Sequence, residues 1–148
     1  MKPRSCWSVL AKKAKDEEET AQTAAARARN KVLELQQSRQ RMDVLLQDYK
    51  ERALVSQAQL QSMSQTTNSR QFLLQLQSLV NRVDEDLRVA LRELEQAKTV
   101  LLQATHQRMK METMQEKDLQ AVQTWERKRD QKEMDSLGLT LYNLKVRP

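Results

Sequence analysis

Apolar residues recur along the first part of the chain at alternating steps of four and three. Only three of the seventeen positions on this seam are polar, namely Glu18, Arg39 and Ser56. A period of 3.5 residues sustained over this length is typical of a coiled-coil helix, because a helix of period 3.6 drifts off such a seam. The pattern predicts a helix over about residues 5–63. The first seam comprises Trp7, Ala11, Ala14, Glu18, Ala21, Ala25, Ala28, Val32, Leu35, Arg39, Met42, Leu46, Tyr49, Ala53, Ser56, Leu60 and Met63.

The first seam ends in the polar stretch "SMSQTTNSR", residues 62–70, which has no apolar residue after Met63. Ser, Thr and Asn side chains compete with the backbone hydrogen bonds of a helix. Asn68 or Ser69 is suited to cap the start of a following helix. The stretch therefore predicts a turn over about 64–70.

A second seam follows and predicts a helix over about residues 71–137. Two successive steps of four, at Leu79, Val83 and Leu87, predict a stutter that locally unwinds the supercoil. The second seam comprises Phe72, Leu76, Leu79, Val83, Leu87, Ala90, Leu94, Ala97, Leu101, Ala104, Arg108, Met111, Gln115, Asp118, Val122 and Trp125.

Two seams joined by a short polar stretch predict an all-α fold, an antiparallel coiled-coil hairpin that forms a single domain over 1–148. With the turn at 64–70, the numbers of facing residues sum to about 136, so that Tyr49 faces Leu87. Residues beyond about 132 then have no partner in the first helix, and a tail, 138–148, follows a break at Gly138. The same register places Met63 opposite Phe72, Leu60 opposite Leu76, Leu35 opposite Leu101, Ala25 opposite Met111 and Ala11 opposite Trp125.

Composition supports long helices, since the chain has one Gly, two Pro at positions 3 and 148, and only 3% aromatic residues. The net charge is +6, but acidic and basic residues are interleaved and the excess lies towards the two chain ends. A nucleic-acid-binding protein usually has a denser basic stripe with aromatic residues that stack on bases. Nucleic acid is therefore not an expected partner.

The sequence contains no constellation that predicts catalysis, a metal site or a cofactor. His106 is the only His and Cys6 the only Cys, and one Gly cannot supply a phosphate-binding loop. The acidic runs at 16–19 and 84–86 are typical of solvated helix faces. We expect a protein that is not an enzyme. Its single Cys, the lack of an 18-residue apolar run and the lack of a signal-peptide core favour a cytosolic protein that does not insert into membranes.

The stretch "ERKRDQKEMDSL", residues 126–137, carries too little apolar surface to fold alone, yet nothing in it breaks a helix. It suits a solvated helix end, a disordered tail or a surface for a partner. Its end lies beyond the predicted hairpin, as a helix that continues into solvent or into another protein.

Four stretches together resemble the flagellar export protein family FliJ. They are "WSVLAKKAKDEEETAQTAAARA" at the start, "LLQDYKER" with Tyr49, "RQFLLQLQSLV" and "ERKRDQKEMDSL". The resemblance covers nearly the whole chain. It implies a soluble cytoplasmic protein of the flagellar type III export apparatus, peripherally associated with that apparatus at the inner membrane and folded as an antiparallel hairpin like the stalk of rotary ATPases.

The resemblance also implies partners. They are the export ATPase FliI, whose hexameric ring takes the end where the two termini meet, the export-gate protein FlhA, and export chaperones. The gate-binding patch would comprise Met42, Leu45, Tyr49, Phe72, Leu76, Leu79 and Val83. The ATPase-binding residues would comprise Trp7, Trp125, Arg127, Arg129, Lys132, Met134, Asp135 and Leu137. Exposed ion pairs contribute only ~0–1 kcal/mol each, so such contacts permit sliding or rotation.

Three alternatives remain at the level of the sequence. The first is the equivalent stalk protein of a virulence type III injectisome, which shares the fold. The second is a generic scaffold in which an extended helix dimerises with another copy, since this would satisfy the same heptads. The third is a basic hairpin that binds nucleic acid, with an affinity that falls steeply with salt.

Overall fold

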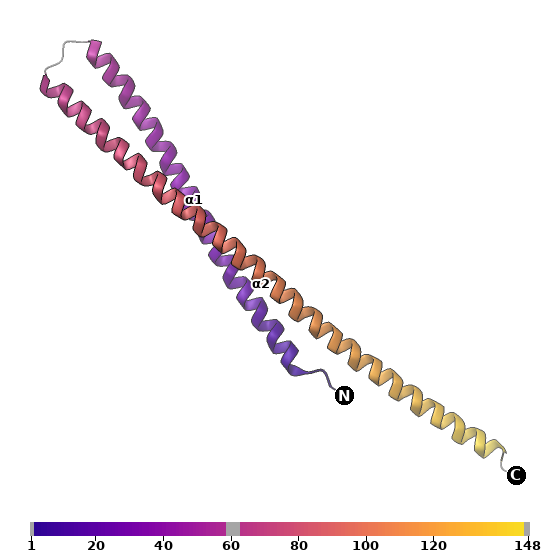
Figure 1. Ribbon diagram of the computed structural model, residues 1–148. Helices are drawn as coiled ribbons and strands as arrows, with labels where there is room; N and C mark the ends of the chain where they lie inside the picture. The colour runs from indigo at the N-terminus through magenta and orange to yellow at the C-terminus, as the bar shows by residue number, and fades with distance from the viewer. Residues whose placement is uncertain (1, 59–62, 147–148) are drawn as a thin grey trace. The chain divides into compact units, whose positions relative to one another are not determined.

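The computed structural model describes residues 2–58 and 63–146 of the chain, and they form two long helices (Figure 1). Helix α1 runs over Ser5–Ala58 and helix α2 over Met63–Val146. No strand occurs in these described ranges. The two helices pack against each other, so the prediction of an all-α hairpin of two long helices is confirmed.

The chain divides into two compact units, each containing a segment of both helices. The first unit comprises residues 1–20 and 102–148, and the second comprises residues 21–101. The helices are antiparallel in each unit: in the second, Lys31 lies 3.5 Å from Glu93, whereas Arg39, later in α1, pairs with Asp84, earlier in α2. The assignment of all 148 residues to a single domain stays a prediction.

The first predicted seam is the face of α1 that packs on α2. All of its positions from Trp7 to Ala53 are buried or half-buried. Ala predominates among the fully buried positions, with Ala14 only 4% exposed and Ala25 only 2%. Small side chains let the two helix backbones approach closely. Leu60, a predicted seam position near the end of the first seam, lies outside the described residues.

The second seam is confirmed from Val83 to Val122, where every predicted position is buried or half-buried. Before Val83 the prediction is wrong in part. Phe72 and Leu79 are 45% and 47% exposed, whereas Val80 is only 5% exposed. The seam passes through Val80 in regular steps of four and three, so the predicted stutter does not occur.

The predicted turn is also misplaced, because residues 64–70 belong to α2. The stretch contains neither Gly nor Pro, and Ser, Thr and Asn reduce helix stability only slightly relative to other polar residues. Thr66 and Ser69 continue the spacing of the seam and are half-buried. A polar seam is therefore tolerated here without ending the helix.

This earlier start of α2 changes the predicted register. The ring of Tyr49 contacts Phe72 rather than Leu87, with ring centroids 4.6 Å apart. Arg4 pairs with Asp118 in the first unit, and there too the two residue numbers sum to about 122 instead of 136. The predicted facing pairs are thus displaced by about ten to fifteen residues along α2.

The largest hydrophobic cluster lies in the second unit. Val32 of α1 packs with Ala90 and Leu94 of α2, and Leu35 and Leu87 pack against them. Ala90 is 1% exposed. A core of this width holds two helices together without a third layer.

Candidate interaction surfaces

Helix α2 continues for 24 residues beyond the part that packs on α1. Val122 is 5% exposed, and every described residue from 123 to 146 is exposed. We call residues 123–146 the extension; in Figure 1 it is the yellow end of α2, which runs past the start of α1. The sequence predicted an overhang beyond about 132. It begins earlier because the true register pairs α1 with residues about twelve positions nearer the start of α2.

The predicted break at Gly138 and the predicted tail, 138–148, are not observed over the described residues, because α2 continues to Val146. Gly138 has no positive φ, and apart from its chain neighbours and the adjacent helix backbone no atom lies within 4 Å of the position that a Cβ would take. An isolated Gly weakens a helix by only ~1 kcal/mol relative to Ala, so it need not end one.

The first part of the extension, residues 126–136, is dominated by interleaved charges. Arg129 lies 3.7 Å from Asp130, and its guanidinium carbon lies 5.1 Å from the centre of the Trp125 ring. Trp125 is 41% exposed, so this cation–π contact lies on the surface. The charged part therefore offers both signs of charge to a partner along one helix.

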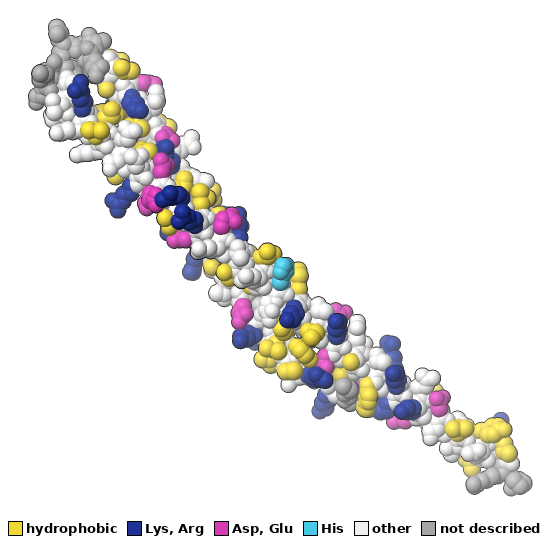
Figure 2. All heavy atoms as spheres, in the orientation of Figure 1, with side chains coloured by type: hydrophobic (Ala, Val, Ile, Leu, Met, Phe, Trp, Pro, Cys, Tyr) yellow, Lys and Arg dark blue, Asp and Glu magenta, His cyan; other side chains and the backbone are white. Residues whose placement is uncertain are grey.

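The second part, residues 137–146, is rich in exposed apolar side chains and contains no acidic residue. We call it the apolar end. Figure 2 shows hydrophobic side chains gathered at this end of α2. The continuous helix fixes the sides of α2 on which these side chains lie.

Most of the predicted ATPase-binding residues come together on the extension. These are Trp125, Arg127, Arg129, Lys132, Met134, Asp135 and Leu137, and all of them are exposed. Trp7 is the exception, since it is half-buried on the first turns of α1.

The predicted gate-binding residues all lie in the second unit, on both helices. Tyr49 of α1 and Phe72 of α2 form a tilted ring pair with an interplanar angle of 48°. Leu45 is 50% exposed, and Phe72 and Leu79 are also exposed, whereas Leu76 is 5% exposed. Met42 and Val83 are half-buried. Leu76 thus packs inside the hairpin, and the accessible members are Leu45, Phe72 and Leu79.

An arginine in the seam of each unit bridges the two helices, which sequence reasoning missed. In the first unit, Arg108 Nε donates to Glu18 Oε2 at 2.5 Å and Arg108 Nη1 donates to Glu112 Oε2 at 2.9 Å. These hydrogen bonds, first that to Glu18 and then that to Glu112, raise the pKa of Arg108 above its ordinary value. The side chain of Glu18 is only 12% exposed.

Arg39 forms the corresponding bridge in the second unit. It pairs with Asp43 on its own helix and with Asp84 on α2. The hydrogen bonds that Arg39 donates to these two carboxylates, first that to Asp43 and then that to Asp84, raise the pKa of Arg39. Both bridging arginines occupy positions of the predicted seams, and Arg39 is one of the three polar positions of the first seam. The signal that could have identified each bridge was an acid four residues later on the same helix, together with the correct register.

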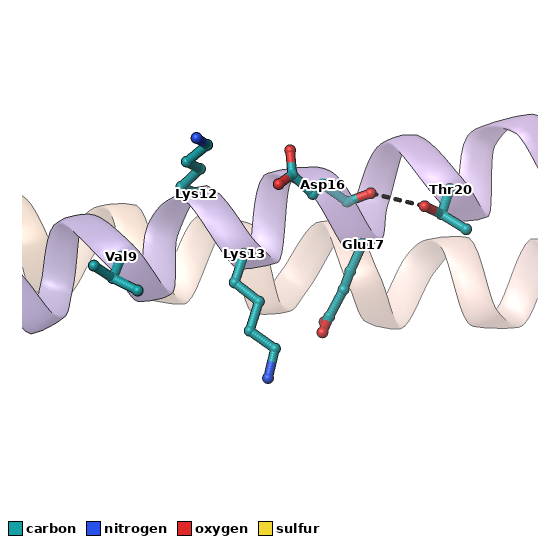
Figure 3. Close-up of a pocket in the computed structure, with 6 residues that line it drawn as sticks. All are labelled: Val9, Lys12, Lys13, Asp16, Glu17 and Thr20. Carbon is teal, nitrogen blue, oxygen red and sulfur yellow. Dashed lines mark hydrogen bonds between the residues drawn. The ribbon is translucent and has the colours of Figure 1, made fainter.

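A hollow on the outer side of α1 contains charged side chains but no arrangement typical of catalysis (Figure 3). It is lined by Val9, Lys12, Lys13, Asp16, Glu17 and Thr20. Within it, Thr20 Oγ1 donates a hydrogen bond of 3.0 Å to the backbone oxygen of Asp16. Over the described residues, no group of three or more His, Cys, Asp or Glu side chains is placed to hold a metal ion. Nor does either helix, where described, contain a stretch long and apolar enough to cross a membrane.

The fold and the extension define a class of protein, a two-helix coiled-coil hairpin with one helix prolonged beyond its partner. The sequence model of the family described as flagellar FliJ protein matches residues 8–147 of the chain. The chain therefore belongs to the flagellar FliJ family, and is a component of the flagellar type III export apparatus. No individual curated protein and no solved structure matches the chain.

Proposed function

We propose that this protein is a stalk-like component that binds the ring of the export ATPase FliI and promotes its assembly and activity. The observation that carries this proposal is the extension, a helix of 24 residues that α1 leaves exposed on all sides. A helix presented in this way can enter a ring and contact it all around. Membership in the flagellar FliJ family supports the same role.

The charges of residues 126–136 suit a contact that can be adjusted. Exposed ion pairs contribute only ~0–1 kcal/mol each, so individual contacts between the extension and a ring can break and re-form cheaply. We propose that Arg127, Arg129, Lys132 and Asp135 form these contacts. Trp7 is half-buried and is a weaker candidate for direct contact.

The test is ATP hydrolysis and sedimentation of the export ATPase with wild-type chain and with a variant that neutralises four charges of the extension. The variant is Arg127→Gln, Arg129→Gln, Lys132→Gln and Asp135→Asn. We expect the wild-type chain to accelerate hydrolysis and shift the ATPase to a larger species, and the variant to lose most of this effect. Arg88→Gln is the matched control, because Arg88 lies in the other unit and pairs with Glu85 on its own helix. Unchanged stimulation by the fourfold variant would refute the proposed contact.

We further propose that the second unit binds the export-gate protein FlhA, through the exposed side chains of Leu45, Phe72 and Leu79. The buried Leu76 and the half-buried Tyr49 would support this patch from within, since Tyr49 holds the Phe72 ring. In this proposal the protein acts by binding rather than by catalysis. It works in the cytoplasm, associates peripherally with the export apparatus at the inner membrane, and escorts export chaperones.

Two of the alternatives are less well supported. The family whose model matches is flagellar, which favours the flagellar export apparatus over an injectisome. The bridges from Arg108 to Glu18 and from Arg39 to Asp84 join the two helices of a single chain. Because the seam is satisfied within one chain, an extended dimer is not needed to bury it.

A further inference from the structure

The apolar end of the extension has a chemistry different from that of the charged part before it. Its apolar side chains are between 60% and 65% exposed, whereas a hairpin core residue such as Leu94 is 8% exposed. From residue 137 to 146 the only charged residue is Lys145. Such a segment cannot bind a partner through ion pairs, and the exposure of its apolar side chains to water is unfavourable.

Apolar side chains lie on two sides of this helix. Leu137, Leu141 and Leu144 follow one another at steps of four and three and form a first stripe. Leu139, Tyr142 and Val146 follow at steps of three and four and form a second stripe. At 3.6 residues per turn the two stripes are centred roughly 165° apart around the helix. A helix that is apolar on opposite sides is one that becomes enclosed rather than one that lies on a flat surface.

The first stripe is not an extension of the hairpin seam. Continued at the same steps beyond Val122, the seam would pass through Trp125, Arg129, Lys132, Ser136, Leu139, Asn143 and Val146. A longer α1 would therefore meet Leu139 and Val146 of the second stripe, but no residue of the first stripe. The first stripe has a position of its own, which points to a binding partner other than α1.

The apolar area that a partner can bury distinguishes between two kinds of partner, a second copy of this chain and a concave protein surface. One exposed aliphatic side chain offers on the order of 100 Å² of apolar surface, so one stripe offers roughly 300 Å² and both offer roughly 600 Å². A stable interface buries about 800 Å² on each partner. A second helix would cover one stripe and fall far short of this value. A socket that covers both stripes, together with contacts to the adjacent charged part, would reach it.

We propose that the apolar end, residues 137–146, is a plug that binds in a two-sided, apolar-lined socket of the ATPase that the charged part contacts. This inference rests on the proposed function and adds to it a fixed hydrophobic attachment. The adjustable ion pairs of residues 126–136 and the buried plug would then have different roles. The ion pairs allow movement of the chain in the ring, and the plug holds the chain in the complex.

The test uses two threefold variants of the full chain, one for each stripe. Leu137→Gln, Leu141→Gln and Leu144→Gln remove the first stripe; Leu139→Gln, Tyr142→Gln and Val146→Gln remove the second. Gln has a helix propensity close to that of Leu, so the helix is kept while the apolar surface is lost. Leu74→Gln is the matched control, because Leu74 is 68% exposed and lies in the other unit.

The dissociation constant for the export ATPase is measured for each chain, and sedimentation equilibrium gives the oligomeric state of each chain alone. We expect each threefold variant to bind at least about tenfold more weakly, the control to bind like wild type, and all chains to be monomers. If only one of the two threefold variants binds more weakly, the ATPase contacts one side of the helix, and the proposal of a two-sided socket is refuted. A wild-type dimer that either variant dissociates would identify a second copy as the partner and overturn the proposal.

The same measurements separate the plug from the proposed function. If both threefold variants bind like wild type while the fourfold charge variant loses stimulation, the plug is refuted and the stalk role stands. If the wild-type chain does not bind the ATPase at all, both are refuted.

Discussion

At the scale of single residues, the bridging arginines join the two helices through charged groups that lie in the seam. Arg108 occupies a seam position between two carboxylates, and the side chain of Glu18 opposite is only 12% exposed. A carboxylate that has lost most of its contact with water needs a charged partner, and it is costly to leave it without one. The position therefore tolerates a polar residue only because the register brings Glu18 to it.

We expect Arg108→Met to lower the melting temperature of the hairpin, because it leaves Glu18 without its partner. Thermal unfolding followed by circular dichroism at 222 nm gives the shift. Arg88→Met is the control and should have little effect, since Arg88 and Glu85 lie on one helix with side chains 62% and 55% exposed.

The double variant Arg108→Met with Glu18→Met tests the bridge itself. It should be more stable than Arg108→Met alone, because no charge is then left unpaired in the seam. Equal stability of the single and double variants would show that Glu18 is adequately solvated without Arg108.

At the scale of the helices, the close packing of α1 on α2 depends on alanines in the seam. Ala25 is 2% exposed, and its neighbour Ala26 is exposed on the other side of α1. The two positions have the same side chain and nearly the same place in the sequence. They differ in whether the partner helix covers them.

Ala25→Leu should destabilise the hairpin by about 1–3 kcal/mol, because added methylene groups in a filled seam push the two helices apart. Ala26→Leu should change the free energy of unfolding by less than about 0.5 kcal/mol, as is usual for exposed positions. Urea denaturation of both variants measures the difference. Similar changes in the free energy of unfolding for the two variants would mean that α1 and α2 are not closely packed around Ala25.

At the scale of the whole molecule, the register decides which residues of α2 remain beyond α1. Facing residues sum to about 122 in the structure, as the pair Arg4 and Asp118 shows. A sum of 136 would cover α2 to about residue 132 and leave a shorter extension. The length of the extension is thus a consequence of where the two helices are joined.

Spin labels on a Cys6→Ser background can measure this register. Labels at Lys50 and Gln71, whose numbers sum to 121, should lie close together. Labels at Lys50 and Asp86, whose numbers sum to 136, should lie further apart, because they are offset by roughly 20 Å along the helix axis at a rise of 1.5 Å per residue. Double electron–electron resonance gives both distances, and an excess of unlabelled chain should leave them unchanged. The reverse order of distances would restore the register predicted from the sequence.

The sequence by itself determined the fold class, the family, the inner face of α1 as far as it is described, and the inner face of α2 from Val83 to Val122. These follow from local properties, because a 3.5-residue period of apolar positions and the absence of interior Pro specify two long helices whatever their pairing. All described positions of the first seam, from Trp7 to Ala53, are buried or half-buried as predicted. The charged stretch 126–137 was likewise recognised as lying at least partly beyond the hairpin.

Only the tertiary structure decided the register, the start of α2, the bridges at Arg39 and Arg108, and the full extension. Polar residues 64–70 can form either a turn or a helix, because the difference in local free energy is small, and packing against the other helix decides between them. That choice moves every pairing by about ten to fifteen residues. The partners of Glu18 and Asp84, and the exposure of residues 123–146, depend on contacts between residues far apart in the chain, which the periodicity of either helix alone does not contain.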